Sequence, residues 1–200
     1  MGGVAPETLA AFVLASALIE LTPGPNMAWL AVVAATEGRR PGFAAVAGVA
    51  LGLGTIGLAA ALGAAAIVTA SPVLYHALGW GGVLYLLFLA WDGWRSAGDG
   101  VGDTRVSTAR AFRRGLVTNL LNPKAAVFYL SVLPAFLPGP EGTLTLTAAY
   151  VAVATAIHAA IVALAGFARA LLEDPVSEAR ARRLLSLSLV PVALWLAFKV

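Results

Sequence analysis

The 200-residue chain is 60% hydrophobic and only 12% charged, with a mean hydropathy of +0.88. Soluble domains carry roughly 25% charged residues, so this composition excludes a protein that folds with a water-exposed surface. The chain has no cysteine, which excludes disulfide bonds, thiolate nucleophiles and cysteine-based metal sites. Its net charge of +3 is better interpreted by position than as a sign of nucleic-acid binding.

Long apolar blocks follow one another along the chain and predict an all-α integral membrane protein with six transmembrane helices. A spanning helix needs about 20 residues, so the first and fifth blocks are long enough to tilt or break, and the last is short. A cleaved signal peptide is the alternative for the first block, but no positive charge precedes it and Glu20 interrupts it. The blocks cover residues 8–36, 43–70, 72–94, 115–137, 144–172 and 184–200.

Basic residues are concentrated in alternate loops. Eleven of the 13 Lys and Arg side chains follow the first, third and fifth blocks, whereas the loops after the second and fourth blocks have none. Because cytoplasmic loops carry an excess of Lys and Arg, these three loops are predicted to be cytoplasmic, and both termini are predicted to lie outside. Anchoring of this topology is the simpler explanation for the arginines, and a lipid or regulatory site within 105–114 is the alternative.

The charge pattern also divides the chain into two halves of three helices. Residues 1–97 and 115–200 are the predicted halves, and residues 98–114 form a cytoplasmic linker rich in Gly, Asp and Arg. Three crossings return the chain on the opposite side, so the second half must enter the membrane in the inverted direction. Inverted repeats of this kind are typical of secondary transporters.

Each half has a proline-containing break in its first apolar block. Proline removes a backbone donor and clashes with the preceding turn, so a continuous helix is disfavoured at both points. The freed backbone groups must line a polar cavity or be buried in protein. A structural kink is the alternative, but two matched breaks favour a binding site on the substrate or ion pathway. The break residues are Thr22, Pro23, Gly24, Pro25 and Asn26 in the first half, and Asn119, Asn122, Pro123 and Lys124 in the second.

Two charged residues lie deep in these broken blocks. At a rise of 1.5 Å per residue, Glu20 lies about 18 Å from a helix start near residue 8, and Lys124 lies about 15 Å from Arg114. Both positions are near the middle of a hydrocarbon core of about 30 Å, where charges are costly and face a partner or an aqueous path. One hypothesis is a Glu20–Lys124 ion pair that locks the halves together. In the other, Glu20 binds a substrate ammonium or a proton.

The segments 22–26 and 119–124 resemble those of the lysine exporter family, which includes the homoserine and threonine resistance exporters. Supporting stretches are Gly38–Gly42, Gly48–Gly52 and Tyr85–Trp91 followed by Trp94 and Arg95. The resemblance extends over nearly the whole chain. It implies a small protein of the bacterial cytoplasmic membrane that exports amino acids, with the two break segments at its transport core.

The resemblance has two departures, and neither removes it. Many relatives have an acidic residue where Leu53 follows Gly52 here, and relatives tend to have glycine where Pro191 stands. The first departure leaves the coupling ion open. The spacing of Gly48 and Gly52 allows close helix approach, either within one monomer or in a homodimer.

The prediction from the sequence is a secondary transporter for amino acids or close analogues, driven by proton antiport through alternating access. An enzyme is disfavoured because no metalloprotease helix, nucleophile elbow or carboxylate cluster is present in the sequence. A membrane subunit that depends on a partner protein is the alternative. No catalytic residue, cofactor or metal is predicted. His158 is interpreted as a buried, hydrogen-bonded side chain, with a proton relay as its alternative role.

Overall fold

A computed structural model describes residues 4–21, 24–62, 71–96, 107–122, 124–125, 128–136, 142–169, 180 and 183–198, and every element among these residues is helical. The all-α prediction is therefore confirmed for the described part of the chain. The elements are α1 (Pro6–Leu21), α2 (Pro25–Glu37), α3 (Arg39–Ala61), α5 (Pro72–Ser96), α6 (Thr108–Leu120), the π-helix η1 (Phe128–Val132), α8 (Leu133–Ala135), α9 (Thr143–Arg169) and α11 (Leu189–Ala197).

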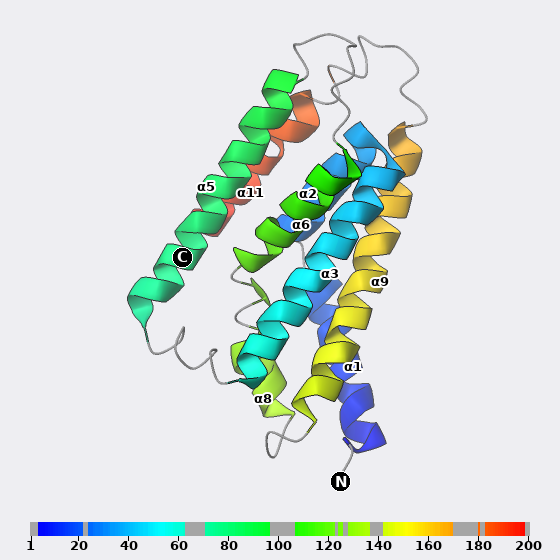
Figure 1. The fold of residues 1–200 in the computed structure, drawn as a ribbon, viewed down its shortest axis with the longest axis vertical. Coiled ribbons are helices and arrows are strands. Elements are labelled where there is room, and N and C mark those ends of the chain that lie inside the picture. The colour runs from blue at the N-terminus through cyan, green and yellow to red at the C-terminus, as the bar shows by residue number, and fades with distance from the viewer. Residues whose placement is uncertain are drawn as a thin grey trace.

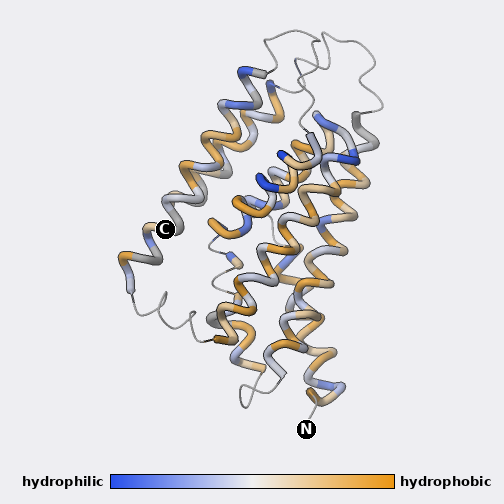
Figure 2. Tube along the Cα trace, in the orientation of Figure 1, coloured by the Kyte–Doolittle hydropathy of each residue, from blue (hydrophilic) through white to orange (hydrophobic). Residues whose placement is uncertain are grey.

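The helices run along the long axis of the molecule (Figure 1). α1 begins at the end that holds the N-terminus, and α2 finishes at the opposite end, where α5 and α9 also finish and where α3 and α6 begin. This second end carries arginines in the first turn of α3, the last turn of α5 and the first turns of α6. Hydrophilic residues gather there in Figure 2, so basic charge is segregated to one end of the described helices.

Two described helices, α3 and α9, are long and apolar enough to cross a membrane. A third span results if α1 and α2, which are bent by 63° at the first break, are counted as one. Trp80–Asp92 within α5 is a shorter apolar segment. The described residues thus contain two or three clear apolar spans, and the arrangement of six crossings stays a prediction.

α3 lies at the centre of the packing, against α2, α6 and α9. α3 and α6 pack closely because each helix has a glycine that faces the backbone of the other. A Cβ at Gly48 would fall against the carbonyl oxygen of Phe112, and one at Gly115 would fall against that of Ala45. The small-residue spacing predicted to allow close approach therefore brings together helices of the two predicted halves within one chain.

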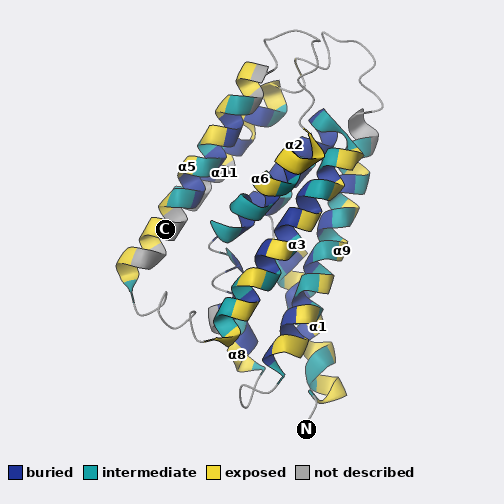
Figure 3. Ribbon diagram, viewed as in Figure 1, coloured by how far each residue is buried: buried dark blue, intermediate teal, exposed yellow. Residues whose placement is uncertain are grey.

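α5 and α11 pair with each other beside this core, around Val83, Leu86 and Ala193. One ion pair ties α5 to α6, with Arg114 Nη2 2.7 Å from Asp92 Oδ2. Figure 3 shows exposed residues along the outer faces of the helices, whereas α2 is mostly buried. Those outer faces carry large apolar side chains, among them Leu18, Leu84 and Leu164, and suit contact with lipid better than with water.

We predict that Gly115→Ala destabilises the protein, because the added methyl group would overlap the backbone of Ala45 and separate α3 from α6. Overpacking of this kind costs about 1–3 kcal/mol. Gly54→Ala is the matched control, since nothing lies within 4 Å of a Cβ at that position. Thermal unfolding of both variants in detergent measures the difference. Equal midpoints would contradict the close contact of α3 and α6.

Candidate functional site

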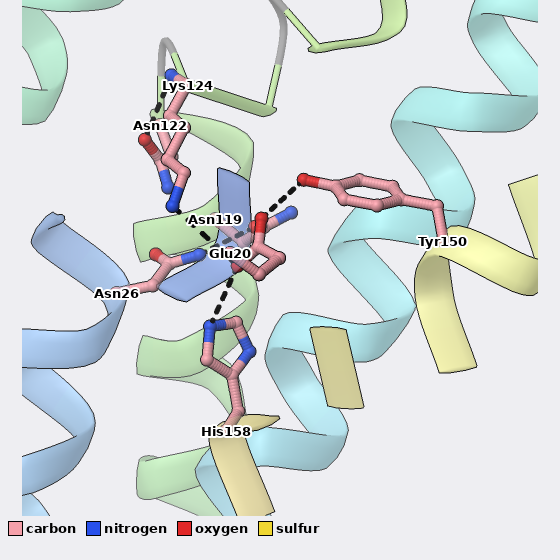
Figure 4. A network of polar contacts seen from close by, with 7 residues as sticks. All are labelled: Glu20, Asn26, Asn119, Asn122, Lys124, Tyr150 and His158. Carbon is pink, nitrogen blue, oxygen red and sulfur yellow. Dashed lines mark hydrogen bonds and ion pairs between the residues drawn. The ribbon is translucent and has the colours of Figure 1, made fainter. Parts of the chain in front are cut away.

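The carboxylate of Glu20 is the centre of the site (Figure 4). Glu20 lies in the last turn of α1, directly before the first break, and only 4% of its surface is exposed. Its Oε1 accepts a hydrogen bond of 2.6 Å from the hydroxyl of Tyr150. Its Oε2 lies 3.4 Å from Nε2 of His158 and 3.9 Å from Nζ of Lys124. One buried carboxylate therefore faces three potential proton donors.

Lys124 comes from the second break, so the two deep charges that the sequence singled out do approach each other. The residues after α6 explain how Lys124 is presented. α6 ends at Leu120, and the side-chain oxygen of Asn122 accepts a hydrogen bond of 3.1 Å from the backbone N–H of Lys124. Asn122 thus satisfies a backbone donor where the chain turns, which is the usual role of Asn at the start of a helical turn.

α9 supplies the two partners of Glu20 that sequence reasoning ranked low or missed. Tyr150 is not among the residues predicted from the sequence, and His158 is interpreted there as a buried, hydrogen-bonded side chain, with a proton relay as the alternative. The two residues are separated by eight positions, which places them about two turns apart on one face of a helix. Ala154 lies between them on this face, and all three residues are buried. The spacing was visible in the sequence, but Glu20 as their shared partner was not.

The two breaks also meet through their asparagines. Asn26, at the start of α2, donates a hydrogen bond of 2.8 Å from its Nδ2 to Oδ1 of Asn119 at the end of α6. Gly52 of α3 makes room for this pair, because a Cβ there would lie 2.7 Å from Nδ2 of Asn119. Asn26 and Asn119 are both buried, so segments 93 residues apart share a contact inside the protein.

At the first break the chain is extended at a glycine before α2 begins, whereas at the second break an asparagine side chain accepts a hydrogen bond from the backbone. Gly24 is the extended residue before α2, with φ −159°, and Pro25 is the first helical residue. Among the described residues no side chain caps this end of α2, so its first backbone N–H groups are left without an intrahelical partner. Thr22, Pro23 and Pro123, which the sequence also predicts to be site residues, lie outside the described residues.

Aromatic rings pack around Tyr150, whose hydroxyl donates to Glu20. The ring of Tyr150 stacks on Phe128 of η1 at a centroid distance of 3.6 Å, and Phe128 lies edge-on to Phe12 of α1 at 5.7 Å. Tyr129 and Phe136 complete this aromatic cluster. η1 is a π-helix, an irregularity that is frequent at functional sites. Tyr150 therefore belongs both to the polar site and to the aromatic cluster.

The site retains unused hydrogen-bonding capacity. Among the described residues, Oδ1 of Asn26, Nδ2 of Asn119 and Nδ1 of His158 are buried and have no hydrogen-bond partner. Buried polar atoms without partners are rare, so these atoms are available to a polar solute or to water. No cluster of three or more His, Asp or Glu side chains suited to a metal ion occurs in the described part of the chain. The arrangement suits a small molecule that has both a positive and a negative group.

Comparison with known families agrees with this interpretation. A family model described as LysE type translocator matches residues 17–199, a range that includes both breaks and every partner of Glu20. The chain belongs to the LysE-type translocator family. The resemblance stated from the two break segments is therefore confirmed. Membership in this family also supports the prediction of a transport protein rather than an enzyme.

Other LysE-type proteins resemble this chain over part of its length. The homoserine/homoserine lactone efflux protein of Salmonella typhimurium is 32% identical over 130 residues, which cover 64% of this chain and 63% of that protein. The leucine efflux protein of Klebsiella pneumoniae is 31% identical over 130 residues, or 63% of this chain and 61% of that protein. An uncharacterized membrane protein of Pseudomonas aeruginosa is 33% identical over 137 residues, with coverages of 64% and 63%.

The matched stretch spans less than two thirds of the length of each of these LysE-type relatives. No solved structure matches the chain.

We predict that Asn26→Ala and Asn119→Ala are energetically coupled in this LysE-type protein, because each removes the same hydrogen bond. The interaction term should be about 0.5–2 kcal/mol, measured by unfolding of the two single variants and the double variant. Asn26→Ala combined with Asn122→Ala is the control. Asn122 bonds the backbone of Lys124 rather than Asn26, so that pair should be additive. Equal interaction free energies for the Asn26/Asn119 pair and the Asn26/Asn122 pair would contradict direct contact between the breaks.

Proposed function

We propose that the chain is a secondary transporter that exports amino acids or close analogues across the bacterial cytoplasmic membrane, in exchange for protons. Membership in a translocator family supports transport, and the similarity to a homoserine/homoserine lactone efflux protein and a leucine efflux protein supports amino acids or close analogues as the substrate class. The single observation that carries the proposal is the buried Glu20 carboxylate beside Lys124, each next to a helix break. Charges at this depth are typical of substrate and ion pathways.

Exchange follows from competition for one carboxylate. A proton on Glu20 and a substrate ammonium beside Glu20 neutralise the same charge, so the two are not bound together. Occupation by one releases the other, which is the requirement for antiport. The groups that face Glu20 from the described elements are Tyr150 and His158 of α9 and Lys124 of the second break.

The substrate carboxylate is assigned to the opposite side of the site. Lys124 supplies a positive charge, and the uncapped start of α2 supplies N–H groups and the positive end of the helix dipole. Asn26 and Asn122 orient the substrate through their amides, while the backbone conformations of Gly24 and Pro25 hold the break open. Thr22, Pro23 and Pro123 belong to the same proposed pathway.

The proposed architecture is a six-helix inverted repeat, with residues 1–97 and 115–200 as the halves and residues 98–114 as a cytoplasmic linker. The arginine-bearing helix ends, which all lie at one end of the molecule, support a cytoplasmic location for that end and an outside location for both termini. Alternating access would then consist of movement of the halves around the two breaks. A homodimer is compatible with this arrangement and is not required by it.

The central prediction is gradient-dependent uptake of an amino acid by inside-out vesicles that contain only the purified chain. An acidic vesicle interior should accelerate uptake, because protons leave as substrate enters. Glu20→Gln should lower this uptake by about tenfold or more, since the variant cannot be protonated and leaves Lys124 without its anion. Glu7→Gln, which alters an exposed carboxylate at the start of the same helix, is the matched control.

Absence of uptake of every amino acid by folded protein would overturn the proposal. Restoration of uptake by an added membrane protein would instead favour a partner-dependent subunit.

The topology gives a separate prediction, and the absence of cysteine makes it direct to measure. Glu7→Cys in α1 and Arg113→Cys in α6 each place one thiol at an exposed position. A membrane-impermeant maleimide should label residue 7 only from outside the cell and residue 113 only from the cytoplasmic side. Labelling of both from the same side would contradict an odd number of crossings between them.

A further inference from the structure

The proposed site has a balanced and very small set of charges. The sequence places Glu20 as the only charged residue within 8–36 and Lys124 as the only one within 115–140. Segments 43–70, 72–91 and 142–168 contain no Asp, Glu, Lys or Arg at all. Glu37 and Arg39 lie at helix ends, and Arg114, about two turns into α6, is paired with Asp92 of α5. Apart from this internally neutralised pair, the described interior of the bundle offers one fixed anion and one fixed cation.

We propose that the substrates of this chain are amino acids with uncharged side chains. This inference rests on the proposed transport function and specifies its substrate class. A zwitterion brings one ammonium and one carboxylate, which are matched by Glu20 and Lys124, and the occupied site keeps zero net charge. Any additional charge on the substrate is left in a buried apolar region without a counter-charge.

Basic amino acids are excluded by the missing second carboxylate. Lysine has two ammonium groups, and either one can use Glu20, but segments 43–70, 72–91 and 142–168 hold no second acidic side chain to meet the other, and Asp92 is already paired with Arg114. Protonation of His158 would add a further positive charge and make the mismatch larger. The uncharged groups around Glu20, which are the amides of Asn26 and Asn119 and the ring of Tyr150, cannot compensate a cation fully.

Acidic amino acids are excluded by the missing second cation. Lys124 can meet one carboxylate of glutamate. Among the described residues, His158 is the only other group near Glu20 that can carry a positive charge, and its Nε2 faces Oε2 of Glu20 at 3.4 Å. A protonated imidazole would therefore be paired with Glu20 and would compete with the substrate ammonium. Neutral side chains, in contrast, can lie against the amides or the aromatic cluster without any cost of charge burial.

The test compares substrates of the same backbone whose side chains are charged in one member and neutral in the other, in vesicles that contain the purified wild-type chain. The matched pairs are lysine with Nε-acetyl-lysine, ornithine with citrulline, and glutamate with glutamine. At equal concentration and pH gradient, we expect the neutral member of each pair to enter at least about tenfold faster. Lysine or glutamate uptake equal to that of its neutral partner would overturn the substrate class while leaving export itself intact. Absence of uptake of every compound by folded protein would overturn the proposed function instead.

A second variant tests the charge argument by adding the missing anion. Asn26→Asp is nearly isosteric, and Nδ2 of Asn119, which has no partner in the structure, can turn to donate to the new carboxylate. This variant should gain lysine uptake relative to acetyl-lysine. Asn26→Ser removes the amide without adding charge and should not gain it. A folded Asn26→Asp variant that still rejects lysine would overturn the charge argument, and the wild-type pairs decide the question if the variant does not fold.

Discussion

Burial of the Glu20 carboxylate is the constraint on which the rest of the structure depends. An ionised group in an apolar interior must be compensated by hydrogen bonds and opposite charge, and no residue of α1 itself supplies either. The compensation comes from α9, through Tyr150 and His158, and from the second break, through Lys124. Two distant segments, α9 and the second break, must therefore converge on the end of α1, and this convergence is what assembles the site.

Close packing around α3 holds that convergence in place. Gly48 lies against the backbone of α6, and Gly52 accommodates Asn119, so the second break is positioned by backbone contact rather than by flexible side chains. α5 and α11 are attached differently, as a pair that packs on α2 through α11 and is linked to α6 by the part-buried Asp92–Arg114 ion pair. The site is thus built on the densely packed part of the bundle, as precise positioning of polar groups requires.

The features predictable from the sequence were those with a local physical cause. A glycine between two prolines disfavours a continuous helix, so the first break could be predicted from residues 22–26 alone. Counting the helical rise from the predicted helix starts placed Glu20 and Lys124 at a similar depth. Tyr150 and His158 could not be assigned in this way. Their role depends on the rotation and position of α9 relative to α1, and these are set by tertiary packing between residues about 130 positions apart. An i, i+8 pair on a buried helix is equally compatible with ordinary core packing.

The double role of Tyr150 bears on how binding and movement are connected. Its hydroxyl donates to Glu20, while its ring stacks on Phe128, which in turn contacts Phe12 of α1. A proton or an ammonium on Glu20 weakens the carboxylate as an acceptor, and the hydrogen bond from the Tyr150 hydroxyl weakens with it. Because the side chain is rigid beyond two torsions, any displacement of this hydroxyl would displace the ring as well. Tyr150 therefore connects the carboxylate to the packing between α1 and η1, and in the proposed transporter this contact would link the binding event to the rearrangement of the halves.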